Sequence, residues 1–149
     1  MTREAIFSAL FALSENVTWS NGPFKTRSRR VKLFSDVPKE QQPALYQAEH
    51  DELSSQTSKM PYKNIYSASW IIYQATGFSP SAIPAVENNL ILDAVYAAIA
   101  PLPTDPGYPQ RNTLGGLVYH CYIDGSVFKD PGDIDNQGML VIPIKLLVP

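Results

Sequence analysis

The stretch GMLVIPIKLLV, residues 138–148, decides the fold of this chain. Alternate positions are aliphatic, and in a strand they all lie on one face of the sheet: Leu140, Ile142, Ile144, Leu146 and Val148. The positions between them are mostly apolar too, which predicts a strand covered on both faces, by helices or by another subunit. Pro143 has no N–H to donate, so we expect this strand to lie at a sheet edge or to carry a bulge there.

The residues before this stretch complete a C-terminal unit that begins at Thr113. Leu117–Phe128 has the pattern of a strand, and Lys129–Gln137 reads as an acidic loop between the two strands. Pro101–Gly116 is rich in proline and glycine and predicts a long connection into the first strand of the pair. Long connections of this kind tend to be functional or to be ordered by a partner.

Working back along the chain, two helices and three further strands are expected. Thr2 can cap a first helix that runs to about Leu13, and Pro84 suits the first turn of a main helix over Ser81–Ala100. In that main helix Val86, Leu90 and Ile91 belong to the apolar face, and Glu87, Asn88 and Asp93 to the wet side. The expected strands are a weak one over Phe24–Leu33, one starting over Gln42–Ala48, and the longest over Tyr62–Ala75. Glu49–Ser58 is polar and is expected to be a long loop or the tip of a hairpin.

This order, α-β-β-β-α-β-β, predicts an α+β fold: a mostly antiparallel sheet with two helices packed on it. The 149 residues form a single domain, 1–149, large enough for a substantial core. A hydrophobic share of 44% with 17% charged residues is typical of a globular chain. The net charge of −2 argues against a DNA binder that works by bulk charge. No apolar run is long enough to cross a bilayer, so we expect no membrane association.

Three short motifs partly match a metal site, a catalytic cysteine or a phosphate loop, and each favours a structural interpretation. Asp133–Gly138 resembles the first half of a calcium loop, but the position of the closing Glu is Ile144. His120 and Cys121 are adjacent in a strand and point to opposite faces, so Cys121 is most simply a core thiol. The glycine pair in Leu114–Leu117 lacks the helix and the Lys-Ser/Thr pair of a phosphate loop. We therefore expect no catalytic residue, no metal and no cofactor.

Two groups of motifs resemble the tail terminator (tail completion) proteins of tailed bacteriophages. In the N-terminal half these are Ser28-Arg29-Arg30, Ser35-Asp36-Val37-Pro38 and Gln42-Pro43-Ala44-Leu45. In the C-terminal half they are Thr113-Leu114-Gly115-Gly116-Leu117-Val118, His120-Cys121, Gly125, Val127-Phe128-Lys129-Asp130 and Gly138 with Ile142-Pro143-Ile144. The likeness covers nearly the whole chain, except Glu49–Lys59, and none of these motifs is catalytic.

The resemblance implies a structural virion protein at the tail or neck, assembled in the host cytoplasm. Copies would form a hexameric ring at the head-proximal end of the tail tube, stop tube growth and offer a surface to the head connector. Its partners would be the tail tube protein, the head–tail connector or neck protein and, in a tail that has one, the sheath. DNA would pass through the lumen without sequence-specific binding.

Two charged segments are candidates for the subunit boundaries of such a ring, because each subunit of a head-to-tail ring presents two different surfaces. One is a basic strand with Arg27, Arg29 and Arg30, and the other is an acidic loop with Asp130, Asp133 and Asp135. The alternative for the arginines is an ordinary solvent-facing strand. Two other functions stay open: another neck, connector or baseplate component, and a small hydrolase with an unrecognised site.

Overall fold

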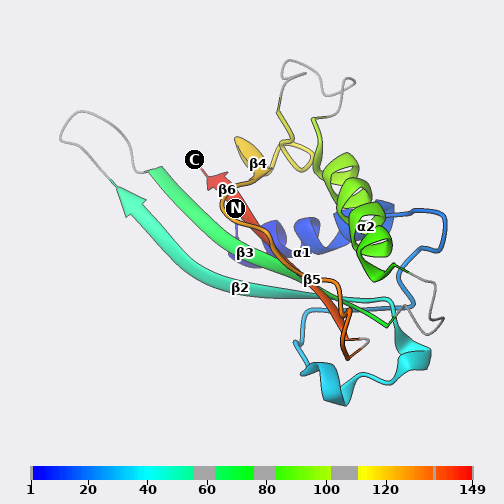
Figure 1. Cartoon of the computed structure of the whole chain (residues 1–149). Coiled ribbons are helices and arrows are strands. Elements are labelled where there is room, and N and C mark those ends of the chain that lie inside the picture. The colour runs from blue at the N-terminus through cyan, green and yellow to red at the C-terminus, as the bar shows by residue number, and fades with distance from the viewer. Residues whose placement is uncertain (1, 56–62, 76–82, 102–110, 136, 149) are drawn as a thin grey trace.

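A computed structural model describes residues 2–55, 63–75, 83–101, 111–135 and 137–148 (Figure 1). Within these residues the chain forms two α-helices, three short 3-10 turns (η1 to η3) and six strands, which confirms the α+β class. The elements in order are α1 (Arg3–Leu13), η1 (Ser14–Asn16), β1 (Thr26–Ser28), η2 (Phe34–Asp36), η3 (Lys39–Gln41), β2 (Ala44–Ser55), β3 (Lys63–Gln74), α2 (Pro84–Ile99), β4 (His120–Ile123), β5 (Phe128–Asp130) and β6 (Gly138–Val148).

The strands form one sheet in the order β1-β2-β3-β6-β4, and β5 also pairs with β6. Only β1 runs parallel to its neighbour β2; the other described pairs are antiparallel. β6 is therefore an inner strand, and the expectation of an edge position is wrong. The register of β6 against β3 runs without a shift from Asn64↔Val148 to Gln74↔Gly138, so there is no bulge between those two strands either.

Pro143 is tolerated inside the sheet because its nitrogen faces a break in the neighbouring strand. β4 pairs with Ile144–Leu147 and β5 with Met139–Val141, so Pro143 falls between them. The carbonyl of Pro143 accepts from Asp124 N on that side, at 3.3 Å. The nitrogen and the carbonyl of one strand residue point to the same side, so the missing donor costs the β3 ladder nothing.

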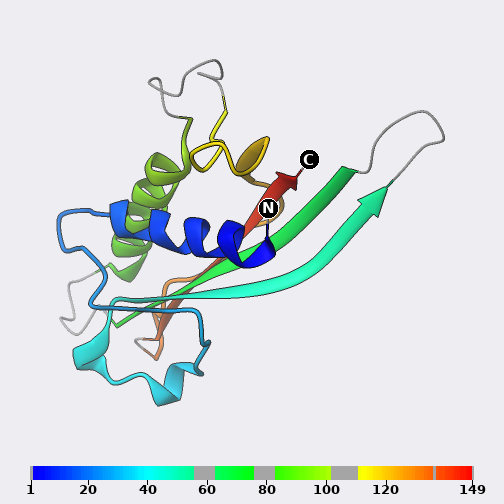
Figure 2. The ribbon, with the colours of Figure 1, turned by 180° about the vertical axis from the view of Figure 1, so that it is seen from behind.

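Both helices pack on one face of the sheet, which we call the inner face (Figures 1 and 2). Thr2 caps α1 as predicted, since its side chain accepts from Ala5 N at 3.2 Å. Three side chains of α1 are buried, Ile6, Phe7 and Leu10. On α2 the predicted apolar residue Ile91 is buried, together with Val95 and Ile99, whereas Val86 and Leu90, predicted on the same apolar face, are exposed. The five aliphatic residues of β6 complete this core: Leu140, Ile142, Ile144, Leu146 and Val148.

No α-helix among the described residues covers the other, outer face of the sheet. At one end of this face Val37, Ala44, Tyr46 and Tyr73 form a second, smaller core, packed against Phe34. The remaining outer-face residues of β6, among them Val141, Lys145 and Leu147, are half-buried. Within the described residues, helices thus cover β6 on the inner face only, and the expected alternative for the other face, cover by another subunit, stays a prediction.

Several predicted element boundaries are wrong. The strand predicted over Phe24–Leu33 is reduced to the three residues of β1, and the one over Leu117–Phe128 to β4 and the start of β5. Of the two alternatives for Glu49–Ser58, the long loop is wrong, because β2 continues to Ser55 and pairs with β3 there as the end of a hairpin. This exposed half of β2 projects with β3 past both helices, and residues 56–58 lie outside the described residues (Figures 1 and 2). The prediction that Asn88 lies on the solvent-facing side of α2 is also wrong, because Asn88 is buried.

Candidate functional site

The basic strand β1 is fastened to the helix layer rather than turned to solvent. Arg27 donates from Nη1 to the Oγ of Ser14 at 2.8 Å, and from Nη2 to Glu15 at 3.1 Å. Ser14 is almost fully buried, so this contact closes the junction between α1 and β1. Arg27 therefore acts within its own subunit.

Arg29 is held in the same way. It forms ion pairs with Glu4, in the first turn of α1, and with Glu49 on β2, the latter at 2.9 Å. Hydrogen bonding to Glu4 raises the pKa of the Arg29 guanidinium, and the same contact lowers the pKa of the Glu4 carboxyl. Arg30 differs, because its side chain is exposed and forms no ion pair with any described residue. Of the three predicted arginines, only Arg30 is available to a partner.

The acidic residues lie at the opposite edge of the sheet from β1. The Oδ1 of Asp130 accepts from Gly132 N at 3.1 Å, and the Oδ1 of Asp135 accepts from Gln137 N at 3.0 Å. Asp133 is exposed, and the neighbouring Ile134 is fully exposed. The two predicted segments thus mark opposite edges of one sheet and do not meet within a subunit.

The partial calcium motif has no room to close. Ile144, at the position of the closing carboxylate, is fully buried in β6 and pairs with Ala68 and Ile123. In the part of the chain that the structure describes, no cluster of three or more His, Cys, Asp or Glu side chains could hold a metal ion. The acidic residues 130–135 instead line a shallow hollow of about 350 Å³.

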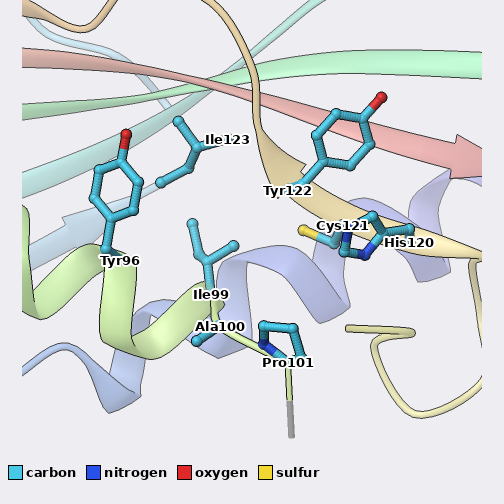
Figure 3. A pocket seen from close by; sticks show the side chains of 8 residues that line it. All are labelled: Tyr96, Ile99, Ala100, Pro101, His120, Cys121, Tyr122 and Ile123. Atoms are coloured by element: carbon cyan, nitrogen blue, oxygen red, sulfur yellow. The ribbon is translucent and has the colours of Figure 1, made fainter. Parts of the chain in front are cut away.

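His120 and Cys121 line a mainly apolar groove of about 290 Å³ between the C-terminal end of α2 and β4 (Figure 3). Burial raises the pKa of the Cys121 thiol to about 12, so the nucleophilic thiolate is scarce at neutral pH. Burial, with the nearby Arg111 cation, lowers the pKa of His120. The Nδ1 of His120 already accepts from Asn112 N at 3.2 Å, and the ring stacks on Tyr122. The predicted core role of Cys121 is confirmed by its burial.

A further hollow on the outer face was not anticipated. It lies where β2 and β3 begin to project, and has a volume of about 420 Å³. We call it the hairpin hollow; its lining residues are Asp51, Glu52, Leu53, Ile65, Ser67, Tyr122, Asp124 and Lys145. It draws on β2, β3, β6 and the segment formed by β4 and the turn after it. No sequence pattern identifies it, because the residues come from four separate segments.

Inside this hollow, two of the charges are already engaged. Lys145 donates from Nζ to the Oγ of Ser67 at 2.8 Å, and Glu52 pairs with Arg3 at 2.8 Å. Asp51 and Asp124 are exposed and form no ion pair with any residue the structure describes. The hollow therefore combines the apolar side chains of Leu53 and Ile65 with the carboxylates of Asp51 and Asp124.

Comparison with protein-family models and with curated protein sequences gives no match for this chain. Neither described helix is long and apolar enough to span a lipid bilayer.

Proposed function

We propose that this chain is a structural subunit of a bacteriophage tail, of the tail terminator type. Six copies form a ring at the head-proximal end of the tail tube, end its growth and join it to the head connector, and DNA passes through the lumen. The protein then resides in the virion, at the tail or neck. The proposal starts from the sequence motifs that resemble this family.

One observation carries the proposal furthest: within the described residues, helices cover one face of the sheet only. On the other face Leu53 is 63% exposed, Phe128 is 52% exposed, and Ile65 and Leu147 are half-buried. Apolar side chains left open on a sheet face favour a partner surface. A subunit that performs its role by contact with copies of itself needs such a surface.

The unlike edges of the sheet support a head-to-tail arrangement of copies. A closed ring with rotational symmetry uses two different, complementary patches on each subunit. Here the β1 edge carries the exposed cation Arg30, and the β5 edge carries exposed Asp133 and Ile134. An isologous dimer would not need this asymmetry.

Two motifs of the resemblance, residues 113–118 and 35–38, fall at turns that shape the subunit. Leu114, Gly115 and Gly116 all have positive φ, at 51°, 74° and 93°, and Asn112 Oδ1 accepts from Leu114 N at 3.1 Å. Glycine is favoured in this left-handed region. In Ser35–Pro38, Val37 is buried in the second core. Both motifs stabilise the fold, as expected of a protein that works through its shape.

The experiment is addition of the purified protein to tail tubes that lack a terminator, followed by electron microscopy. We expect a ring at one end of each tube and no further elongation when free tube protein is added. Tubes already capped by their own terminator are the control and should bind none. Tubes that keep growing at the same rate would contradict the proposal, and rings at the opposite end would favour a baseplate component.

A further inference from the structure

An exposed segment at one end of the outer face has the chemistry to fill the hairpin hollow at the other end. Residues 30–33 read Arg-Val-Lys-Leu, and all four side chains are exposed, Val31 by 43% and Leu33 by 69%. The backbone is nonetheless fixed, because the Tyr73 hydroxyl donates to the carbonyl of Lys32 at 2.7 Å. We call residues 30–33 the basic segment.

The two surfaces match in charge and in polarity. The hollow holds three carboxylates and one amine, and Arg3 already pairs with one of these carboxylates, Glu52, which leaves a net charge of −1. The basic segment carries the opposite charge, +2 from Arg30 and Lys32. The apolar side chains of Val31 and Leu33 correspond to the apolar side chains of the hollow. The long side chains of Arg and Lys can lie along apolar surface and still bring their charge to a rim.

The segment cannot reach the hollow of its own subunit. Ile65 lines the hollow, and Tyr73, eight residues further along the same strand, holds the segment. Eight residues of a strand span roughly 26 Å. A contact between the two surfaces therefore joins different copies of the chain.

We propose that the basic segment of one copy docks in the hairpin hollow of the next. The contact is heterologous, since it joins one end of the sheet to the other end of a neighbour, and its repetition forms a ring when the rotation between copies closes. The inference rests on the proposed function and deepens it, by naming the residues that join successive subunits. It replaces the pairing of Arg27 and Arg29 with the Asp130–Asp135 loop, because both arginines are engaged within the subunit.

The first test uses charge-reversed variants, examined by light scattering alone and on tail tubes. R30E/K32E and D51K/D124K should each fail to assemble at concentrations at which the wild type forms oligomers. An equal mixture of the two should assemble again, since every contact then joins opposite charges. The matched controls K25E/K129E and E40K/D93K change the net charge equally, elsewhere on the surface, and should assemble like the wild type.

The second test detects the contact even when assembly is transient. A mixture of L33C and L53C should form a disulfide-linked dimer on oxidation, at least tenfold more than a mixture of I134C and L53C. Variants that assemble normally, or a mixture that stays monomeric, would overturn the inference, as would equal cross-linking in the two mixtures. If the wild type still caps tubes in that case, the proposed function stands; if it neither assembles nor binds tubes, both fall.

Discussion

At the scale of single residues, Cys121 shows how burial alone sets chemical behaviour. Its side chain is 1% exposed, and its pKa rises from about 9 to about 12. The unfolded chain loses this proton at lower pH than the folded chain. Stability from the neutral thiol is therefore complete below pH 9 and is lost as the pH rises toward 12.

We expect the stability advantage of the wild type over C121A to shrink between pH 9 and 11. A titrating group of this kind changes the unfolding free energy by about 1.4 kcal/mol per pH unit. Urea unfolding of both proteins at pH 7, 9, 10 and 11 measures the effect. Burial also raises the pKa of Tyr46 and Tyr73, but these tyrosines are present in both proteins. Their contribution therefore cancels in the difference between wild type and C121A, which reports on Cys121. Parallel curves over the whole range would show that the thiol does not titrate in this way.

Arg27 and Arg30 look alike in the sequence but should differ on substitution. R27A removes the hydrogen bond to the buried Ser14 hydroxyl, and we expect the unfolding free energy to fall by about 1–2 kcal/mol. R30A should change it by less than about 0.5 kcal/mol, as is usual for an exposed side chain. Chemical denaturation of both variants provides the measurement, and an equal effect of the two would contradict the assignment.

The sequence could not distinguish these arginines, because their partners are distant along the chain. Ser14 and Glu4 reach Arg27 and Arg29 only when α1 packs across the sheet, and Glu49 reaches Arg29 only when β2 lies beside β1. Cys121 was predictable for the opposite reason: strand alternation alone turns it into the core. Side chains whose environment is local can be placed from sequence, and those fixed by tertiary ion pairs cannot.

At the scale of elements, Pro143 tests how β6 is built into the sheet. P143V should alter stability by less than about 1 kcal/mol, because the added N–H points to the break between β4 and β5. I142P should cost about 3 kcal/mol or more, since Ile142 alternates with Pro143 and turns its N–H to β3. Thermal melting of the two variants separates these outcomes. A severe loss in P143V would mean that the ring of Pro143 itself is needed there.

Asn88 joins α2 to two parts of the sheet, and its loss should be costly. Its Oδ1 accepts from Gln74 Nε2 at 2.8 Å, and its Nδ2 donates to the carbonyl of Asp130 at 3.2 Å. N88A should lower the unfolding free energy by about 2–3 kcal/mol, because both bonds are largely shielded from water. The neighbouring Asn89 is exposed and is the matched control; its Oδ1 accepts a hydrogen bond from Lys129 Nζ at 3.2 Å. N89A should change the unfolding free energy very little. Similar melting temperatures for the two variants would contradict this role.

The elements that were predicted well are those that the core itself patterns. α1, α2, β3 and β6 have apolar periodicity because one side of each is buried. β2 was cut short at Glu49 because its outer half has no core beneath it, so its residues are polar although the backbone remains a strand. The burial of Asn88 could not be predicted for a related reason. A polar side chain can be buried when the fold supplies hydrogen-bond partners, and those of Asn88, Gln74 and Asp130, lie on other elements.

At the scale of the whole molecule, the proposed contact between copies should depend on salt. Its rim pairs Arg30 and Lys32 with carboxylates at the surface, where ions screen charges over about 10 Å at 0.1 M salt. We expect the dissociation constant between copies to rise roughly tenfold from 50 to 500 mM NaCl. Sedimentation velocity at several salt concentrations measures it. A salt-independent constant would point to an apolar contact elsewhere on the outer face.

The interruption of the sheet beside Pro143 has a consequence for strand pairing between copies. A long, uninterrupted edge strand presents free backbone N–H and C=O groups, with which strands of other chains can pair and form fibrils. Here that edge of the sheet is divided into two short strands, β4 of four residues and β5 of three, which pair with β6 on either side of Pro143. Within the described residues, this edge of the sheet therefore offers no long continuous template to the strands of other copies.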